Sequence, residues 1–271
     1  MPDRFVLSAS VGTGGTNRRG DVRDLRSRLN ALGFSWVGID GRVDADLIQA
    51  INLVQSIVRG HQRVSGDGRV DVPGFTYDWL RAENAPRWCV MPAGSRTEGY
   101  INIEREQLQD DHDYGTLWIA EALRAAGSYY RRYWLAGRSD DAPIRVNDVS
   151  RGRGHDTPDH GTHETGLAAD LQLPRKDGLG GNLTFRSESY DVPAMRAQLE
   201  ALRSVGAVRR ILFNDPQFIE AGLCSQLAGH DDHVHVEISV PPRGEPEQLP
   251  EPLRDPTTRA HLAGILGNLR P

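Results

Sequence analysis

Residues 160–170 read HGTHETGLAAD and residues 229–238 read GHDDHVHVEI, and these two stretches decide how the chain is interpreted. Six of the nine histidines lie in or close to them: His155, His160, His163, His230, His233 and His235. Neutral imidazole combined with carboxylate is a ligand set that suits a borderline-soft divalent ion such as zinc. The clustering therefore predicts a metal centre, and scattered structural histidines would rarely produce it.

The spacing within each stretch indicates how the ligands would converge. No histidine follows His163 at the distance of a His-Glu-x-x-His helix, and Gly166 favours a loop that enters a strand. The six residues between His163 and Asp170 are enough for the chain to turn back and present both to one ion. His233 and His235 are two apart in a predicted strand and so share a face. One can bind the metal while the other faces a substrate.

The combined pattern His-x-x-His-x-x-Gly-Leu-x-x-Asp and, far downstream, His-Asp-Asp-His-x-His resembles the penicillin-insensitive murein endopeptidases. These belong to the wider LAS-type group of lysostaphin-like and D-Ala-D-Ala metallopeptidases. The resemblance covers about residues 115–240. It implies zinc as the cofactor and His163, Asp170 and His235 as its ligands. Three protein ligands with one open position are the usual arrangement of a catalytic zinc site.

The same resemblance implies roles for the remaining histidines. His233 would be a catalytic histidine beside the metal, while His230 and His160 would line the site. His230 is the better candidate for the general base. Glu164 stands where the family often has a glutamine-like residue, and Glu237 where a basic residue often follows, but both changes leave the ligand set intact. Asp231 and Asp232 are expected to orient histidine rings.

The N-terminal part has a helical pattern. Apolar residues recur at three- and four-residue spacing over about 22–32 and 44–59, with Asp44 or Asp46 as the N-cap of the second helix, and a third short helix is expected near 77–80. This segment resembles the peptidoglycan-binding domain attached to many wall hydrolases. The matching residues are Asn17, Gly20, Asp21, Val22, Leu25, Leu29, Asn30, Leu32, Gly33, Phe34, Val37, Asp40, Gly41, Ile51 and Gln55. Alternatively, these positions are only the core and turns of an ordinary three-helix unit.

The expected fold class is α+β: a small N-terminal three-helix domain, then a LAS-type metallopeptidase domain with a central antiparallel sheet and flanking helices. The expected domain boundaries are 1–85 for the peptidoglycan-binding domain, 86–113 for a linker, 114–242 for the metallopeptidase domain and 243–271 for a Pro-rich tail. Helices are expected at 116–135 and 191–205, and strands at 144–149, 207–214 and 234–238.

Bulk composition excludes several partners. The net charge of −5 gives no basic field for nucleic acid, and no apolar run approaches the ~20 residues of a membrane span. No ordinary signal peptide is visible, so the expected location is secreted or delivered to the periplasm or cell wall by another route. A phage lysin and a secreted antibacterial effector both fit. Bacterial peptidoglycan is the expected partner, and a delivered effector would add an immunity protein or a secretion-system component.

The expected activity is endopeptidase cleavage of peptide cross-links of the D-Ala–diaminopimelate type. Two alternatives are a D,D- or L,D-carboxypeptidase or D-Ala-D-Ala dipeptidase, and, from another class, a non-catalytic wall-binding protein with a structural zinc. Two smaller questions also stay open. Cys89 and Cys224 could form a disulfide or remain separate thiols, and the aromatic residues at 129–134 fit a core better than a sugar-stacking platform.

Overall fold

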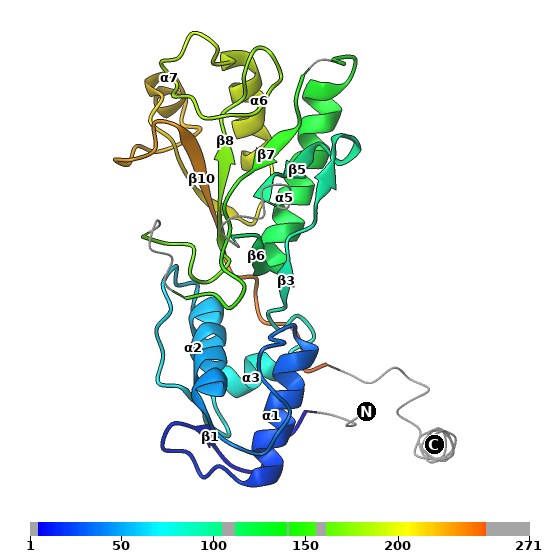
Figure 1. Cartoon of the computed structure of the whole chain (residues 1–271), viewed down its shortest axis with the longest axis vertical. Coiled ribbons are helices and arrows are strands. Elements are labelled where there is room, and N and C mark those ends of the chain that lie inside the picture. Colours follow the sequence, from blue (N-terminus) through cyan, green and yellow to red (C-terminus); the bar gives the residue numbers. More distant parts are fainter. Residues whose placement is uncertain (1–4, 105–111, 140, 156–160, 248–271) are drawn as a thin grey trace, which may run out of the picture.

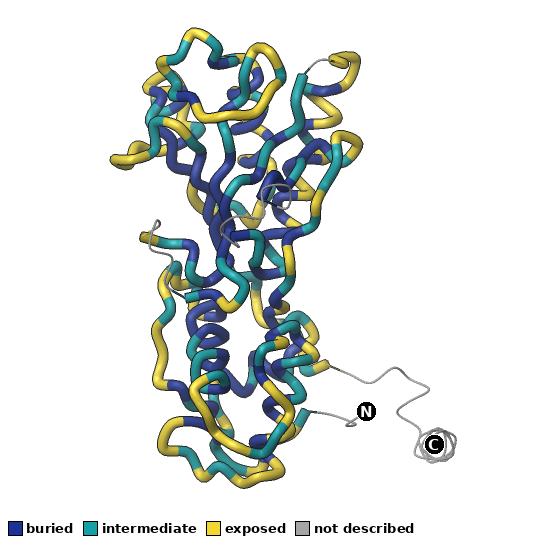
Figure 2. The backbone as a smooth tube through the Cα atoms, in the orientation of Figure 1, coloured by how far each residue is buried: buried dark blue, intermediate teal, exposed yellow. Residues whose placement is uncertain are grey.

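The computed structural model describes residues 5–104, 112–139, 141–155 and 161–247. Figure 1 shows an elongated arrangement, with helices at the end nearest the N-terminus and a sheet with flanking helices at the other end. Buried residues run through both ends (Figure 2). The described chain thus has the mixed α+β composition that the sequence predicts.

A six-stranded sheet in the order β4-β5-β7-β8-β10-β9 lies at the centre of the second half. Its strands are β4 (Gly94–Ser95), β5 (Tyr100–Asn102), β7 (Ile144–Val146), β8 (Ala168–Gln172), β9 (Val208–Leu212) and β10 (His233–Ile238). β5 and β7 pair in parallel, and every other neighbouring pair is antiparallel. The expected antiparallel sheet is therefore wrong at one pair. The reason is that helix α5 (Leu117–Tyr130) lies between β5 and β7 and supplies the crossover that a parallel pair needs.

Helices α5 and α6 (Val192–Arg203) pack against each other beside this sheet. Both begin at a side-chain cap, because the Thr116 hydroxyl accepts from the backbone of Ile119 and the Asp191 carboxylate accepts from that of Ala194. The helices expected at 116–135 and 191–205 are confirmed. The first of them ends in a π-helical turn, η2 (Arg131–Leu135), and the short helix α7 (Pro216–Glu220) follows β9.

Side chains of β10 alternate between two environments. Val234 and Val236 are fully buried, and Val234 pairs with the equally buried Leu171 of β8. This apolar face belongs to the core against which α5 packs. Successive side chains of a strand point to opposite faces, so His233 and His235 lie on the other side of the sheet, away from the apolar core.

The N-terminal part contains three helices and a short two-stranded sheet. They are α1 (Arg19–Ala31), α2 (Ala45–Arg59), α3 (Phe75–Arg81), β1 (Val11–Gly12) and β2 (Arg69–Val70). The helices lie where apolar spacing predicts them. Asp44, and not Asp46, caps α2, because its Oδ1 accepts from the Leu47 backbone at 2.9 Å. A second pair of strands, β3 (Trp88–Val90) and β6 (Tyr114–Thr116), joins the two halves.

Two residues that match the wall-binding pattern make hydrogen bonds that hold the N-terminal part together. The Gln55 side chain bonds Asp67 Oδ1 at 2.7 Å and the Arg69 carbonyl at 2.9 Å, which ties α2 to β2. Asn17 bonds the backbone of Gly12 through both ends of its amide, at 2.8 and 3.0 Å. These contacts give both residues a structural role that needs no bound ligand. Wall binding by this part therefore stays a prediction.

The segment expected to be a linker and the start of the segment expected to be a tail both contribute to the fold. The range 86–113 contains β3, β4, the 3-10 turn η1 (Arg96–Glu98) and β5, whose strands of two or three residues are too short for a recognisable period. The described start of the tail returns to the helical part, where Glu245 O accepts from Glu83 N at 2.9 Å and Glu247 N donates to Arg81 O at 2.7 Å. Residues 248–271 lie outside the described part.

Cys89 and Cys224 are both free, so the alternative of separate thiols holds, and burial raises the pKa of Cys224 to about 11. Among the helices that the structure describes, none combines the length and the hydropathy needed to cross a bilayer.

A buried arginine holds the turn between α1 and α2. Arg26 is 1% exposed, and its guanidinium donates to the carbonyls of Gly38 at 2.7 Å and Arg42 at 2.9 Å. Its Nη2 also lies 2.6 Å from Asp44 Oδ2. Asp44 therefore has two partners, the α2 backbone and the buried guanidinium, whose other acidic contact is Asp40 Oδ1 at 3.5 Å.

Replacing this cap should destabilise the protein. We expect Asp44→Ala to lower the free energy of unfolding by about 1–2 kcal/mol, because a helix N-cap and a partner of Arg26 are lost together. Urea denaturation followed by circular dichroism measures the change. Asp24→Ala, on the exposed face of α1, is the control and should leave the midpoint where it is. Equal midpoints for the two variants would contradict the role given to Asp44.

Candidate metal centre

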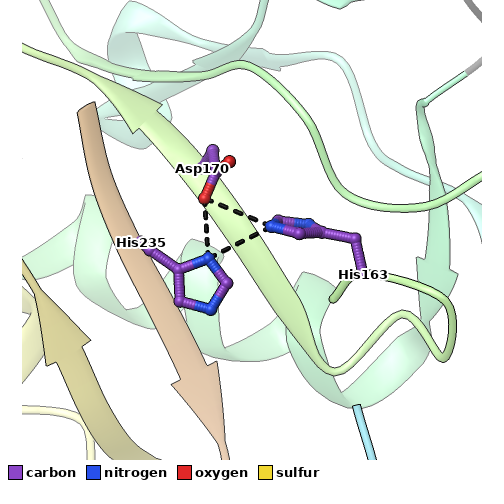
Figure 3. A group of neighbouring side chains, drawn as sticks. All are labelled: His163, Asp170 and His235. Atoms are coloured by element: carbon purple, nitrogen blue, oxygen red, sulfur yellow. Dashed lines mark hydrogen bonds and ion pairs between the residues drawn. The ribbon is translucent and has the colours of Figure 1, made fainter. Parts of the chain in front are cut away.

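Three residues from two adjacent strands and a loop converge on one point. His235 of β10 lies directly opposite Asp170 of β8 in the antiparallel register, so their side chains share a face. His163 reaches the same point from the loop that precedes β8 (Figure 3). His235 Nδ1 is 2.8 Å from Asp170 Oδ1, His163 Nε2 is 3.3 Å from that oxygen, and the two nitrogens are 3.1 Å apart. All three residues are buried.

A hydrogen bond to the far side of the His163 ring and a longer ion-pair contact to the far side of the His235 ring orient the nitrogens that face the cluster. His163 Nδ1 lies 2.8 Å from the Val149 carbonyl, which can only accept, so this nitrogen carries the proton and Nε2 presents its lone pair. His235 Nε2 lies 3.5 Å from Glu237 Oε1, and its Nδ1 faces Asp170. Glu237 is itself buried and is paired with Arg209 Nη2 at 3.0 Å.

The electrostatics of the cluster favour a cation. Burial alone would raise the pKa of Asp170, but the His163 and His235 imidazoles outweigh it and hold this pKa well below its usual range. Burial also opposes protonation of His235, yet Asp170 and Glu237 raise the pKa of that imidazole to about 9. The two buried carboxylates thus create a negative potential at the point where the three ligand atoms meet.

The donor set fits a metal ion. Ligands at about 2.1 Å from a tetrahedral zinc lie about 3.4 Å apart, and the three separations here fall slightly below that value. The most closely spaced pair of ligand atoms needs to move apart by about 0.6 Å, and the other two pairs by less, to bind one ion. His163, Asp170 and His235 could therefore hold a metal ion, as expected from the sequence.

Two further histidines stand beside the cluster. The His230 ring centroid is 4.8 Å from that of His233 and 5.6 Å from that of His235. His233 Nε2 lies 3.7 Å from Asp170 Oδ2, and its Nδ1 is 2.8 Å from Asp232 Oδ1. Burial, with the nearby His233 and His235, lowers the pKa of His230. His160, the third expected catalytic residue, lies outside the described residues.

Of the two aspartates expected to orient histidine rings, only one does so. Asp232 does orient a ring, that of His233. Asp231 instead fixes the loop, because its carboxylate accepts from Asn214 Nδ2 at 2.7 Å and from Arg186 Nη1 at 2.6 Å. The backbone of Asn214 also donates to the His230 carbonyl at 2.9 Å. The loop that carries His230 is therefore held by Arg186 and by Asn214, which follows β9.

No family model matches this chain, and no curated protein does either.

Sequence reasoning missed the partners that orient the ligands. The role of Glu237 could have been predicted from the sequence, because Glu237 follows His233 and His235 at the two-residue spacing of one strand face. Val149 acts through its backbone carbonyl, so the identity of its side chain could not have indicated this role.

His163 has a left-handed backbone conformation, with φ of 75°. This conformation costs a non-glycine residue roughly 1–2 kcal/mol, so it needs support from the surrounding structure.

The aromatic residues at 129–134 are only partly core. Tyr130 is 2% exposed, whereas Tyr133 is 62% exposed, and four of these rings line a cavity of about 300 Å³ between α5 and α6. Their faces already have partners: the Tyr129 and Tyr133 centroids are 4.3 Å apart, and Arg138 lies 4.0 Å over Trp134. The expectation of a core position is therefore confirmed for Tyr130, whereas Tyr133 is not a core residue.

Removing the carboxylate of the cluster should abolish tight metal binding. We expect Asp170→Asn to lose more affinity for Zn²⁺ than the about 10–100-fold that loss of an orienting partner costs, because a charged ligand is lost. Competition with a chromophoric chelator measures the affinity. Asp177→Asn, at an exposed turn, is the control and should bind as the unaltered chain does. Tight binding by Asp170→Asn would exclude this residue as a ligand.

Glu237 provides a milder test of the same centre. Glu237→Gln keeps the shape of the side chain but weakens its hold on His235 Nε2, so the affinity for Zn²⁺ should fall by about 10–100-fold. The exposed Glu220→Gln serves as the matched control in the same titration. An affinity that Glu237→Gln leaves unchanged would mean that His235 is oriented without this carboxylate.

Proposed function

We propose that this chain is a zinc-dependent peptidase that hydrolyses peptide cross-links of bacterial peptidoglycan, of the D-Ala–diaminopimelate type. The observation that carries the proposal is the buried His163, Asp170 and His235 cluster with His230 and His233 beside it. A closed structural zinc site usually has four protein ligands, whereas three with adjacent imidazoles are typical of hydrolytic centres. The sequence resemblance to the penicillin-insensitive murein endopeptidases supports the same choice.

The residues of the site divide into ligands and proton-handling groups. His163, Asp170 and His235 would hold the ion, with Val149 O and Glu237 fixing the two rings. A zinc ion bound there supplies Lewis acidity toward a carbonyl oxygen and toward water. No covalent enzyme intermediate is required, so acylation of a serine by penicillin has no counterpart in this reaction.

His230 is suited to act as the general base. Its lowered pKa keeps the imidazole neutral near pH 7, and a neutral ring can accept a proton. His233 has a different setting, because Nδ1 donates to Asp232 and Nε2 is left facing the cluster. His233 would therefore contact the reacting peptide, where it can hold charge that develops on the carbonyl oxygen.

The N-terminal helical part would bind the wall and keep the peptidase near its substrate, which raises the local concentration of cross-links. Its sequence resemblance to peptidoglycan-binding domains supports this role. Such a substrate lies outside the cytoplasm, so the protein would act as a phage lysin or as an effector delivered to the periplasm or wall of another bacterium.

Mass spectrometry of digested sacculi tests the activity. Cross-linked muropeptide dimers should disappear and monomers should accumulate, a chelator should stop the reaction, and added Zn²⁺ should restore it. Intact dimers with release of terminal D-alanine would instead identify a carboxypeptidase or dipeptidase. Bound zinc and wall binding without any cleavage would identify a non-catalytic protein with a structural zinc.

Substitution of His233 separates catalysis from metal binding. We expect His233→Ala to retain Zn²⁺ while the rate of cross-link cleavage falls by about 10²–10³-fold, the usual cost of losing one group that stabilises the developing oxyanion. His155→Asn is the control: it removes an imidazole outside the cluster, and asparagine tolerates the left-handed backbone of this position. Full activity in His233→Ala would remove this residue from the catalytic machinery.

A further inference from the structure

The loop that carries His163 lies against the helical N-terminal part. Figure 1 shows the segment before β8 next to the end of α2, about 100 positions earlier in the chain. Three hydrogen bonds join the two. Thr165 Oγ1 donates to the His61 carbonyl at 2.7 Å. Arg63 Nε donates to the Gly161 carbonyl at 2.7 Å, and the backbone N–H of Val64 donates to Glu164 Oε2 at 2.5 Å.

The partner segment, residues 61–65, is itself fixed to α2. Ser65 N donates to the Ser56 hydroxyl at 2.7 Å, and that hydroxyl donates to the Ser65 carbonyl at the same distance. His61 N also donates to the Ser56 carbonyl at 3.0 Å. Ser56 is fully buried. Residues 61–65 are therefore held against the end of α2 by hydrogen bonds, and this fixes the positions of their own donors and acceptors.

The bonds to residues 61–65 fall on both sides of the metal ligand. Gly161 precedes His163 by two residues, and Glu164 and Thr165 follow it directly. His163 holds the left-handed backbone conformation between them, a conformation that a histidine keeps only when its neighbours hold it. Thr165 is fully buried, so water cannot replace the His61 carbonyl as the acceptor of its hydroxyl.

Close packing reinforces the same contact. A Cβ on Gly154 would meet the Glu164 carbonyl at 2.7 Å and the Leu53 side chain at 2.9 Å, so this residue is wedged between α2 and the ligand loop. The neighbouring His155 N donates to the Glu164 carbonyl at 3.0 Å. Movement of α2 relative to the sheet would therefore reach the backbone beside His163.

We propose that the helical N-terminal part is a structural component of the metal centre. Residues 61–65 position the His163 loop and thereby set the affinity for the metal, with Thr165 and Glu164 as the positioning residues. The inference rests on the proposed function in so far as the centre binds zinc. The wall-binding part and the hydrolytic centre would then work as one unit, because separating them would release a ligand.

Zinc affinity of full-length variants, measured by chelator competition at fixed pH, tests the proposal. Thr165→Val keeps the shape of the side chain but removes the donor to His61, and Glu164→Ala removes the acceptor for Val64. Each should bind Zn²⁺ about 10–100-fold more weakly, as expected for loss of a group that orients a ligand. Thr165→Ser restores the hydroxyl and should restore the affinity.

Arg243→Ala is the matched control. It breaks the contact of Arg243 Nη1 with Asp78 Oδ2 at 3.2 Å, which joins the C-terminal segment to the helical part away from the His163 loop. Its zinc affinity should equal that of the unaltered chain. Circular dichroism of each metal-free variant checks that the fold is retained, and Arg63→Gln, at an exposed bond to the same loop, replaces any variant that unfolds.

Unchanged affinity in Thr165→Val and Glu164→Ala would overturn the inference, and so would an equal loss in Arg243→Ala. The proposed function fails separately. If the unaltered chain binds zinc but leaves peptidoglycan intact, the peptidase assignment is lost, while the variant affinities still decide whether residues 61–65 position the ligand loop.

Discussion

The register between β8 and β10 is the constraint on which the candidate metal centre depends. It sets His235 directly opposite Asp170, and it also pairs Val234 with Leu171 on the other face. A slip of one residue would turn the histidine toward the apolar core and the valines toward the ligand side. The apolar face and the polar face thus select the same register, so the energy of core packing also places two of the three ligands.

Burial adds a second requirement, because each buried carboxylate of this arrangement needs a charged or hydrogen-bonding partner. Asp170 and Glu237 are both about 95% buried or more, and a buried carboxylate is stable only when it is paired. The imidazoles of His163 and His235 pair with the first, while Arg209 and the His235 ring pair with the second. A divalent cation would satisfy the same negative potential, so the polar network that the fold stabilises could also hold a metal ion.

The third ligand has a different origin, because His163 lies on a loop and not on a strand. Its position depends on backbone contacts: the Val149 carbonyl orients the ring, and residues 61–65 hold the flanking peptide groups. His230 likewise lies on a loop, which Asn214 and Arg186 hold in place through Asp231. The sheet therefore supplies the rigid half of the centre, and two anchored loops complete it.

The sequence by itself determined the main helices, the strands β8 and β10 and the three candidate ligands, because each follows from a local period or a short motif. Tertiary structure alone decided the parallel β5–β7 pair, the burial of Arg26, the role of Val149 and the hydrogen bonds from residues 61–65 to the His163 loop. Those features join residues far apart in the chain, often through backbone atoms that every residue type carries. A local pattern encodes which face of an element is apolar, whereas the packing of distant elements decides which groups meet.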